Sequence, residues 1–169
     1  MHRKLLPQLA PLLGAALIVC GAAQAEADRS FAIIDSQPLG EVWLNAGFYS
    51  YHFRRDKGLN DGNPGIGVDY RFSNVAAVTA GRFYNSDRKY SNYAGFYYQP
   101  IAVGNVRLGA VVGGFNGYPR MHNGGWFLAA IPVASFEYQR FGVNVAVVPS
   151  YKDRLYGAIS LQFKFKIFD

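Results

Sequence analysis

The sequence predicts an all-β protein, an eight-stranded antiparallel transmembrane β-barrel, from three observations. Hydrophobic residues make up 50% of the chain and charged residues 17%, with 13 Phe and 12 Tyr among 169 residues. Apolar side chains alternate with polar or small ones over many segments, as in strands that separate two environments. After residue 25, no run of about 18 apolar residues remains for a transmembrane helix. A membrane-spanning form of this chain would therefore be built from strands.

The alternation is clearest at the carboxyl-terminal end of the chain. Every second residue from Leu155 to Ile167 is apolar or glycine, and the positions between include Lys164 and Lys166. Segments between turn signals predict eight strands, an even number that suits a bacterial outer-membrane barrel. These strands lie at roughly 41–54, 64–72, 75–86, 92–102, 105–115, 125–138, 142–149 and 155–168. Short and long connections alternate, so we expect all the long loops at one rim, facing outside.

The amino-terminal residues have the pattern of a secretory signal peptide. Three basic or polar residues at positions 2–4 precede an apolar stretch that ends in Ala23-Gln24-Ala25, a cleavage site of small residues. The exported chain then contains no cysteine, so packing and strand pairing must stabilise it in place of disulfides. We therefore expect a signal peptide at 1–25, a short periplasmic segment at 26–40 and an outer-membrane barrel at 41–169.

The predicted long loops carry an excess of positive charge. A solvated loop surface would explain this excess. Attraction of anionic phosphates, such as those of lipopolysaccharide, would explain it too, because Arg and Lys make charge-assisted contacts to phosphate. The residues expected at such a phosphate site are Arg54, Arg55, Arg88, Lys89, Lys152 and Arg154. Nucleic acid is a poor fit as a partner of an exported barrel.

Two features suggest that lipid enters the barrel. Both faces of segment 125–138 are apolar, which fits either a packed core or a lumen that holds an acyl chain. Pro132 and Pro149 lie in or beside neighbouring predicted strands, and a proline has no N–H to donate to a closed ladder. The ladder must be interrupted there, by an ordinary bulge or by a lateral opening to the bilayer.

The candidate chemistry lies at the rim that carries the long loops. His52 ends the first predicted strand and Ser86 ends the third, so the two side chains can meet across the mouth. A neutral imidazole can take a proton from a hydroxyl during acyl transfer, and a serine can act as nucleophile or as a hydrogen-bonding partner. His122, in a loop, is a weaker candidate. The His and Cys residues show no metal-ligand spacing, so we expect neither a metal nor a cofactor.

Three patches carry a resemblance to a known family. They are Phe83-Tyr84-Asn85-Ser86 followed by Ala94-Gly95, Tyr51-His52 followed by Pro64-Gly65-x-Gly67, and the proline pair Pro132 and Pro149. Together these patches resemble outer-membrane lipid A palmitoyltransferases. The resemblance covers most of residues 42–168 at low identity.

The resemblance implies a function and a set of site residues. The chain would transfer an acyl group, palmitate in the family, from a phospholipid donor to lipid A, acting as a monomer in the outer membrane. His52 and Ser86 fall on the family's catalytic positions. Asn85 replaces the family's acidic residue, and we expect it to position His52. Lipid would pass laterally near Pro64, Pro132 and Pro149, and Tyr97 replaces the glycine at the floor of the family's acyl pocket.

Two other functions remain open at this stage. A non-enzymatic barrel could use its outer loops as an adhesin or to bind lipopolysaccharide. A lipid A deacylase could use the same Ser and His with water as the acceptor. The proline pair favours a lipid-transfer function over an adhesin, because an adhesin needs no lateral opening.

Overall fold

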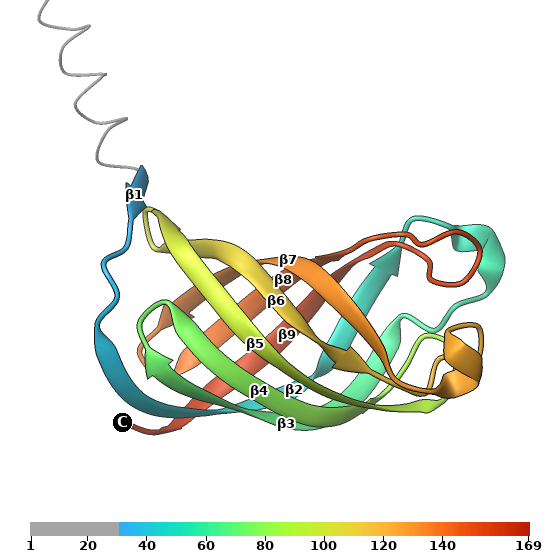
Figure 1. The fold of residues 1–169 in the computed structure, drawn as a ribbon, viewed down its shortest axis with the longest axis horizontal. Coiled ribbons are helices and arrows are strands. Elements are labelled where there is room, and N and C mark those ends of the chain that lie inside the picture. Colours follow the sequence, from blue (N-terminus) through green and yellow to red (C-terminus); the bar gives the residue numbers. More distant parts are fainter. Residues whose placement is uncertain (1–30) are drawn as a thin grey trace, which may run out of the picture.

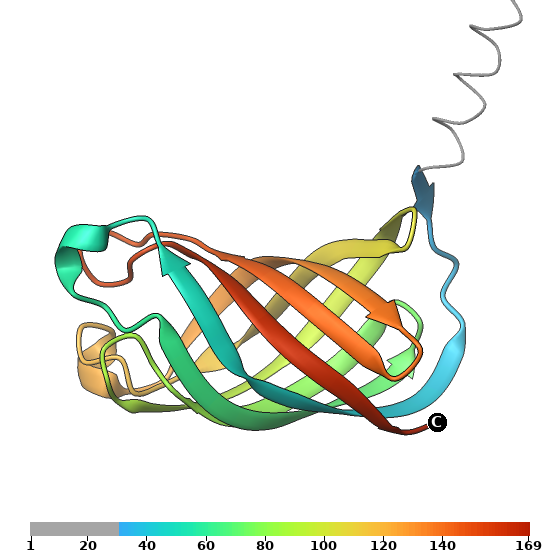
Figure 2. The same cartoon turned by 180° about the vertical axis from the view of Figure 1, so that it is seen from behind.

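The computed structural model describes residues 31–169, and the predicted signal peptide at 1–25 lies outside them. Eight antiparallel strands form one closed barrel (Figures 1 and 2), which confirms the predicted all-β, eight-stranded architecture. They are β2 (Pro38–His52), β3 (Gly62–Ser73), β4 (Ala76–Tyr84), β5 (Tyr90–Val103), β6 (Val106–Phe115), β7 (Phe127–Tyr138), β8 (Phe141–Val148) and β9 (Ala158–Phe168). The barrel closes where β2 pairs with β9, from Val42↔Phe168 to His52↔Ala158.

A short additional strand, β1 (Phe31–Ile33), lies outside the barrel cycle. It pairs antiparallel with the end of β5, from Phe31↔Val103 to Ile33↔Ile101. Asn74, in the β3–β4 turn, fastens the segment that follows β1, because its side chain donates to Asp35 O and accepts from Gln37 N. The barrel therefore begins at Pro38, a little before the predicted boundary at residue 41.

The connections differ in length at the two ends of the barrel. The turns near β1 and the carboxyl terminus are tight, while the long loops gather at the other end, where two short 3-10 helices lie (Figure 1). These helices are η1 (Arg55–Lys57) and η2 (His122–Gly124). Within residues 31–169, no helix is both long enough and apolar enough to cross a membrane. The predicted alternation of short and long connections is present.

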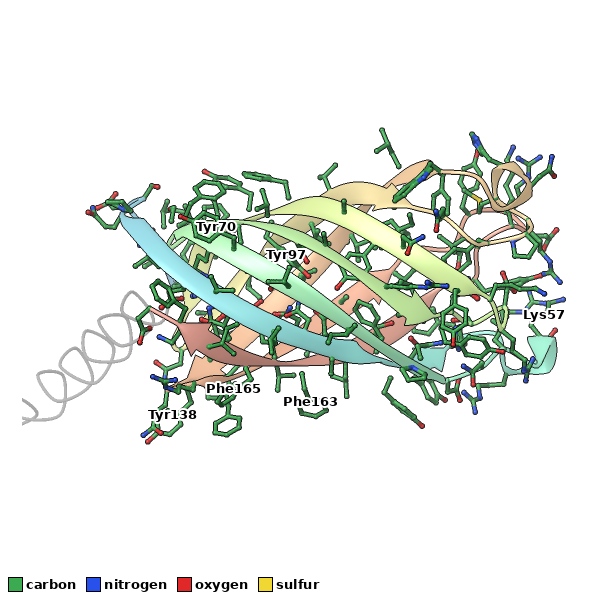
Figure 3. All side chains as sticks on the ribbon, turned by 90° about the horizontal axis from the view of Figure 1, so that it is seen from below. Lys57, Tyr70, Tyr97, Tyr138, Phe163 and Phe165 are labelled. Atoms are coloured by element: carbon green, nitrogen blue, oxygen red, sulfur yellow. The ribbon has the colours of Figure 1, made fainter. Side chains whose placement is uncertain are left out.

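Side chains separate into a lumen and an outer wall. Along β9, Leu161, Phe163 and Phe165 are exposed on the outer wall, and Figure 3 shows the two Phe side chains pointing away from the barrel. The residues between them, such as Gln162 and Lys164, are buried in the lumen. This is the expected two-residue alternation of a strand between two environments.

The lower half of the lumen, near β1, is filled by a network of charged side chains. Glu137 accepts hydrogen bonds from Arg71 and Lys164, and Arg107 Nη2 lies 2.7 Å from its Oε1 atom. Glu41 joins the network through Arg71, at 3.1 Å, and Lys166, at 3.0 Å. Buried charges are tolerated when they are paired in this way. The network closes this end of the lumen.

Removing the shared carboxylate should destabilise the barrel strongly. Glu137→Ala would leave Arg71, Arg107 and Lys164 without their common partner, and breaking a buried pair typically costs about 3–5 kcal/mol. We expect a loss of this size in the free energy of unfolding, measured by urea titration in detergent. Asp56→Ala is the control, because Asp56 is an exposed acid in a loop pair and should change little. Equal losses in both variants would contradict the role of the network.

Candidate active site

Three side chains form a hydrogen-bonded chain at the loop end of the lumen. His52, the last residue of β2, has its Nε2 atom 2.8 Å from Ser86 Oγ and its Nδ1 atom 2.8 Å from Asp61 Oδ1. His52 is 3% exposed, so its imidazole is shielded from bulk solvent. An ionised Asp61 accepts from Nδ1–H, which leaves Nε2 as the acceptor for the Ser86 hydroxyl. The order carboxylate, imidazole, hydroxyl is that of an activated serine nucleophile.

Backbone hydrogen bonds hold the three residues in place. Ser50 N donates to Asp61 O at 2.8 Å, which folds the β2–β3 loop back over the end of β2. Asn60 N donates to Ser86 O at 3.0 Å, which joins the same loop to the β4–β5 connection. The loop reverses at Gly58, whose φ of 62° lies in the left-handed region that glycine adopts readily. The geometry of these three residues therefore depends on the fold of residues 53–61.

Asp61 is held as a carboxylate. The hydrogen bond from His52 and the Arg55 guanidinium, 2.8 Å from Oδ2, lower the pKa of Asp61 below its usual value of 3.8. The stability that these contacts contribute is complete above pH 3.8 and is lost as the pH falls through the lowered value. Asp61 thus carries its charge at neutral pH, where it can stabilise an imidazolium on His52.

The structure corrects the role expected for Asn85. Its side chain does not contact His52, but donates to Ser91 Oγ at 2.8 Å and Gly117 O at 2.9 Å. It also accepts from the backbone N–H groups of Asp87 and Lys89. Asn85 is fully buried and fixes the turn that follows Ser86. The residue that orients His52 is Asp61, from a loop that the sequence argument treated only as charged surface.

A largely apolar cavity extends from this chain of residues into the upper lumen. His52 and Ser86 line its mouth, and side chains from most strands line its walls. The wall residues are Phe48, Phe83, Tyr93, Val111, Phe115, Phe127, Ala129, Ile131, Val133, Ala146 and Val148. This cavity agrees with the expectation of an apolar upper lumen. It can accept a hydrocarbon chain whose carbonyl end stays at the mouth.

Polar side chains form the floor of the cavity. Tyr97 and Asn144 line both this cavity and a smaller polar pocket below it, so they separate the two spaces. Gln162 also lines the cavity and accepts from Asn144 Nδ2 at 3.1 Å. Tyr97 points into the lumen. Its position agrees with its expected place at the pocket floor.

Pro132 and Pro149 lie at an opening in the barrel wall. The β7–β8 ladder begins only at Val133↔Ala146, so β7 has no partner in β8 from Pro132 up to the loop end. Outside this opening lies a groove lined by His122, Trp126, Leu128, Pro149 and other residues. Phe127, Ala129 and Leu155 line both the groove and the inner cavity. At this gap in the ladder, the inner cavity and the outer groove therefore lie on opposite sides of the same short stretch of wall.

Pro64 lies at a different strand pair. The β3–β4 ladder ends at Gly65↔Phe83, one residue below Pro64, and Asn63 Nδ2 donates to Tyr84 O at 3.0 Å above it. The structure therefore does not place the three prolines at one opening. Pro132 and Pro149 share the gap between β7 and β8, whereas Pro64 marks the end of another ladder.

The six basic residues expected to bind phosphate are all exposed at the loop end. Arg54 pairs with Asp56, Arg55 pairs with Asp61, and Arg88 donates to Gly58 O. Lys89, Lys152 and Arg154 form no ion pair with another described residue. Arg154 also lines the mouth of the cavity. The structure thus gives Arg55 a second role, since it holds the carboxylate that contacts His52.

Two further cations of the long loops meet at one tyrosine at the mouth. Arg120 Nη1 donates to Tyr156 Oη at 2.6 Å, and the Lys57 ammonium lies 5.7 Å from the same ring. Tyr156 lines the cavity mouth, and Lys57 marks the loop end of the barrel in Figure 3. Three loops meet here, which sequence spacing alone does not reveal.

Comparisons with known proteins do not assign this chain to a family. No protein-family model matches the sequence, and no curated protein shows significant similarity to it. Within residues 31–169, no group of three or more His, Cys, Asp or Glu side chains is arranged to hold a metal ion. The chemistry of the site is therefore argued from its own geometry.

Asn85→Asp should destabilise the protein. The Asp side chain could not donate the two hydrogen bonds that Asn85 Nδ2 gives to Ser91 Oγ and Gly117 O, and a carboxylate oxygen would face the Gly117 carbonyl. An unsatisfied buried group costs about 1–3 kcal/mol, or more when charged. We expect a loss of at least this size in the free energy of unfolding, measured by urea titration. Asn123→Asp, an exposed loop change of the same charge, should have little effect. An Asn85→Asp variant as stable as the parent would contradict the role assigned to Asn85.

Proposed function

We propose that the protein is an outer-membrane acyltransferase, which moves a fatty acyl chain such as palmitate from a phospholipid to lipid A. The observation that carries this proposal is the chain Asp61–His52–Ser86 at the mouth of an apolar cavity. If the hydrocarbon tail of an ester occupied the cavity, its carbonyl carbon would lie at the mouth. There the base His52 and the nucleophile Ser86 are in hydrogen-bond contact. The resemblance in sequence to lipid A palmitoyltransferases points to the same chemistry.

The outer wall supports a membrane location. Phe and other large apolar side chains are exposed along β9, and similar residues are exposed on most other strands. A soluble protein rarely exposes apolar surface on this scale, whereas a barrel in a bilayer presents such a band to lipid. The gap between β7 and β8, with the groove outside it, is the proposed route by which a phospholipid tail reaches the lumen from the bilayer.

The reaction would follow the order of the three residues. Ser86 Oγ attacks the ester carbonyl of the phospholipid while His52 Nε2 takes the hydroxyl proton. The lysophospholipid leaves and takes that proton back from His52, so the acyl chain remains as an ester on Ser86. A lipid A hydroxyl then attacks this ester, His52 again accepts and returns the proton, and Ser86 is regenerated. Asp61 stabilises the imidazolium in both steps.

The loop end supplies a surface for the acceptor. Lys89, Lys152 and Arg154 are exposed cations without an acidic partner among the described residues, and Arg154 borders the cavity mouth. Lipid A carries phosphate groups, which Arg and Lys bind through charge-assisted contacts. A phosphate held at this rim would keep the acceptor hydroxyl near Ser86.

Substitution of the three residues should abolish transfer while leaving the barrel folded. Loss of a general base typically lowers a rate by about two to four orders of magnitude. We expect losses of this order for His52→Ala, Ser86→Ala and Asp61→Asn, and no loss for His122→Ala. The assay uses the barrel refolded in detergent, a phospholipid with a labelled acyl chain, and lipid A. Heat-modifiable gel mobility checks that each variant is folded.

The fate of the label separates the alternatives. Label transferred to lipid A supports the acyltransferase. If lipid A instead loses a fatty acid in a Ser86-dependent way, the protein is a deacylase that uses water as the acceptor. Parent protein that changes neither lipid would leave the non-enzymatic barrel as the better assignment. Full activity in both His52→Ala and Ser86→Ala would show that the reaction occurs elsewhere.

The floor of the cavity should select the length of the acyl chain. Tyr97→Gly would remove the ring that separates the cavity from the polar pocket below and so deepen the space for a tail. We expect this variant to transfer longer chains than the parent does, measured by mass spectrometry of lipid A after incubation with mixed phospholipids. Tyr98→Gly, which changes a neighbouring outward-facing tyrosine, is the control and should leave the chain-length profile unchanged.

A further inference from the structure

Arg82 differs from every other charged residue in the barrel strands. Seven of those residues point into the lumen, where they are buried or belong to the ion network: Glu41, Asp69, Arg71, Arg107, Glu137, Lys164 and Lys166. Arg82 is exposed on β4 and lies between Gly81 and Phe83, whose side chain is buried in the lumen. By the alternation of a strand, Arg82 therefore points out of the barrel.

The guanidinium of Arg82 rests on an aromatic ring rather than on an acid. Its central carbon lies 4.4 Å from the centroid of Tyr90, and Tyr84 packs edge-on against the same ring at 5.5 Å. Within residues 31–169, the Arg82 side chain forms neither an ion pair nor a hydrogen bond. Stacking occupies one face of the guanidinium and leaves the N–H groups on its edge available.

A second polar side chain lies beside this guanidinium. Asn92, on β5, is directly opposite Arg82 in the β4–β5 ladder and is exposed. The Asn92 side chain has no hydrogen-bond partner in the described part of the chain, while Asn116 Oδ1 accepts from its backbone N at 2.7 Å. The outer wall thus presents Arg and Asn donors side by side and no acid.

The height of Arg82 on the wall explains how a cation is tolerated there. It lies two residues from Tyr84, the last residue of β4, and four from Ser86 at the mouth. An Arg on the lipid face costs about 2–4 kcal/mol at the bilayer centre but about 0–1 near the interface. Exposed Tyr49, Tyr51 and Tyr90 lie near the same loop end, as expected of an interfacial aromatic belt. In a bilayer, the guanidinium would therefore lie at the depth of lipid headgroups.

We propose that Arg82, Tyr90 and Asn92 form a binding site on the outer wall for the phosphate group of a membrane lipid. The guanidinium edge would donate two parallel hydrogen bonds to the phosphate oxygens, and the Asn92 amide would donate a third. The inference rests on the membrane location in the proposed function, but it does not depend on catalysis. It concerns lipid bound on the outer wall of the barrel, whether or not that lipid later reacts at Ser86.

Binding of lipid A tests this proposal without any turnover. Ser86→Ala protein in detergent is the background, and native mass spectrometry measures occupancy by bisphosphorylated lipid A and by dephosphorylated lipid A. We expect Arg82→Gln to weaken binding of the bisphosphorylated form about tenfold, the effect of losing one bidentate charged contact. The affinity of Arg82→Lys should lie between those of Arg82→Gln and the background protein, because an ammonium keeps the charge but not the planar arrangement of donors. Binding should weaken as salt is raised.

Matched variants and probes separate this site from general charge effects. Arg140→Gln removes the same charge from the turn at the opposite end of the barrel and should bind lipid A like the background protein. Inorganic phosphate should compete poorly, because it lacks the tail that holds a lipid at the wall. The proposal would be overturned if Arg82→Gln bound lipid A as tightly as the background protein does. It would also be overturned if the background protein bound bisphosphorylated and dephosphorylated lipid A equally well. Parent protein that binds lipid A at this site but transfers no acyl chain would overturn the proposed function alone.

Discussion

The closed ladder of backbone hydrogen bonds is the constraint on which the rest of the structure depends. Pairing of β2 with β9 joins the first and last strands of the barrel, so every barrel strand pairs with a neighbour on both sides. Closure also fixes two surfaces, because successive side chains must point alternately inward and outward. The lumen, the outer wall and the position of the loops all follow from this arrangement.

The lumen is divided into two parts with different chemistry. The lower part holds paired charges around Glu137, and the upper part holds an apolar cavity with Tyr97 and Asn144 between them. A charged network of this kind resists entry of a hydrocarbon, since separating its pairs would leave buried charges unsatisfied. The charged network around Glu137 therefore limits the cavity to the loop end, where His52 and Ser86 also lie.

Two ladder ends lie beside the cavity. The β7–β8 ladder starts late, at Val133↔Ala146, and the β3–β4 ladder ends at Gly65↔Phe83. Proline is tolerated at such positions because no partner there requires its missing N–H. The proposed lipid route through the first opening and the proposed lipid site around Arg82 thus both use the outer surface near the loop end. A protein that acts on membrane lipids would need such contacts with the bilayer.

The sequence by itself determined the eight strands of the barrel and their alternation, because a period of two is a local property of the chain. It did not predict β1, because a strand of three residues is too short to show that period. It also placed His52 and Ser86 at strand ends at the same rim, and these two side chains do meet. It could not assign Asp61, because the contact with His52 depends on how residues 53–61 fold back, with Ser50 and Ser86 holding that loop through backbone bonds. For the same reason, the sequence suggested Asn85, the neighbour of Ser86, as the partner of His52. In the structure the Asn85 side chain instead donates to Ser91 Oγ and Gly117 O. Only the tertiary structure decides such contacts, since they join loops that are distant in sequence.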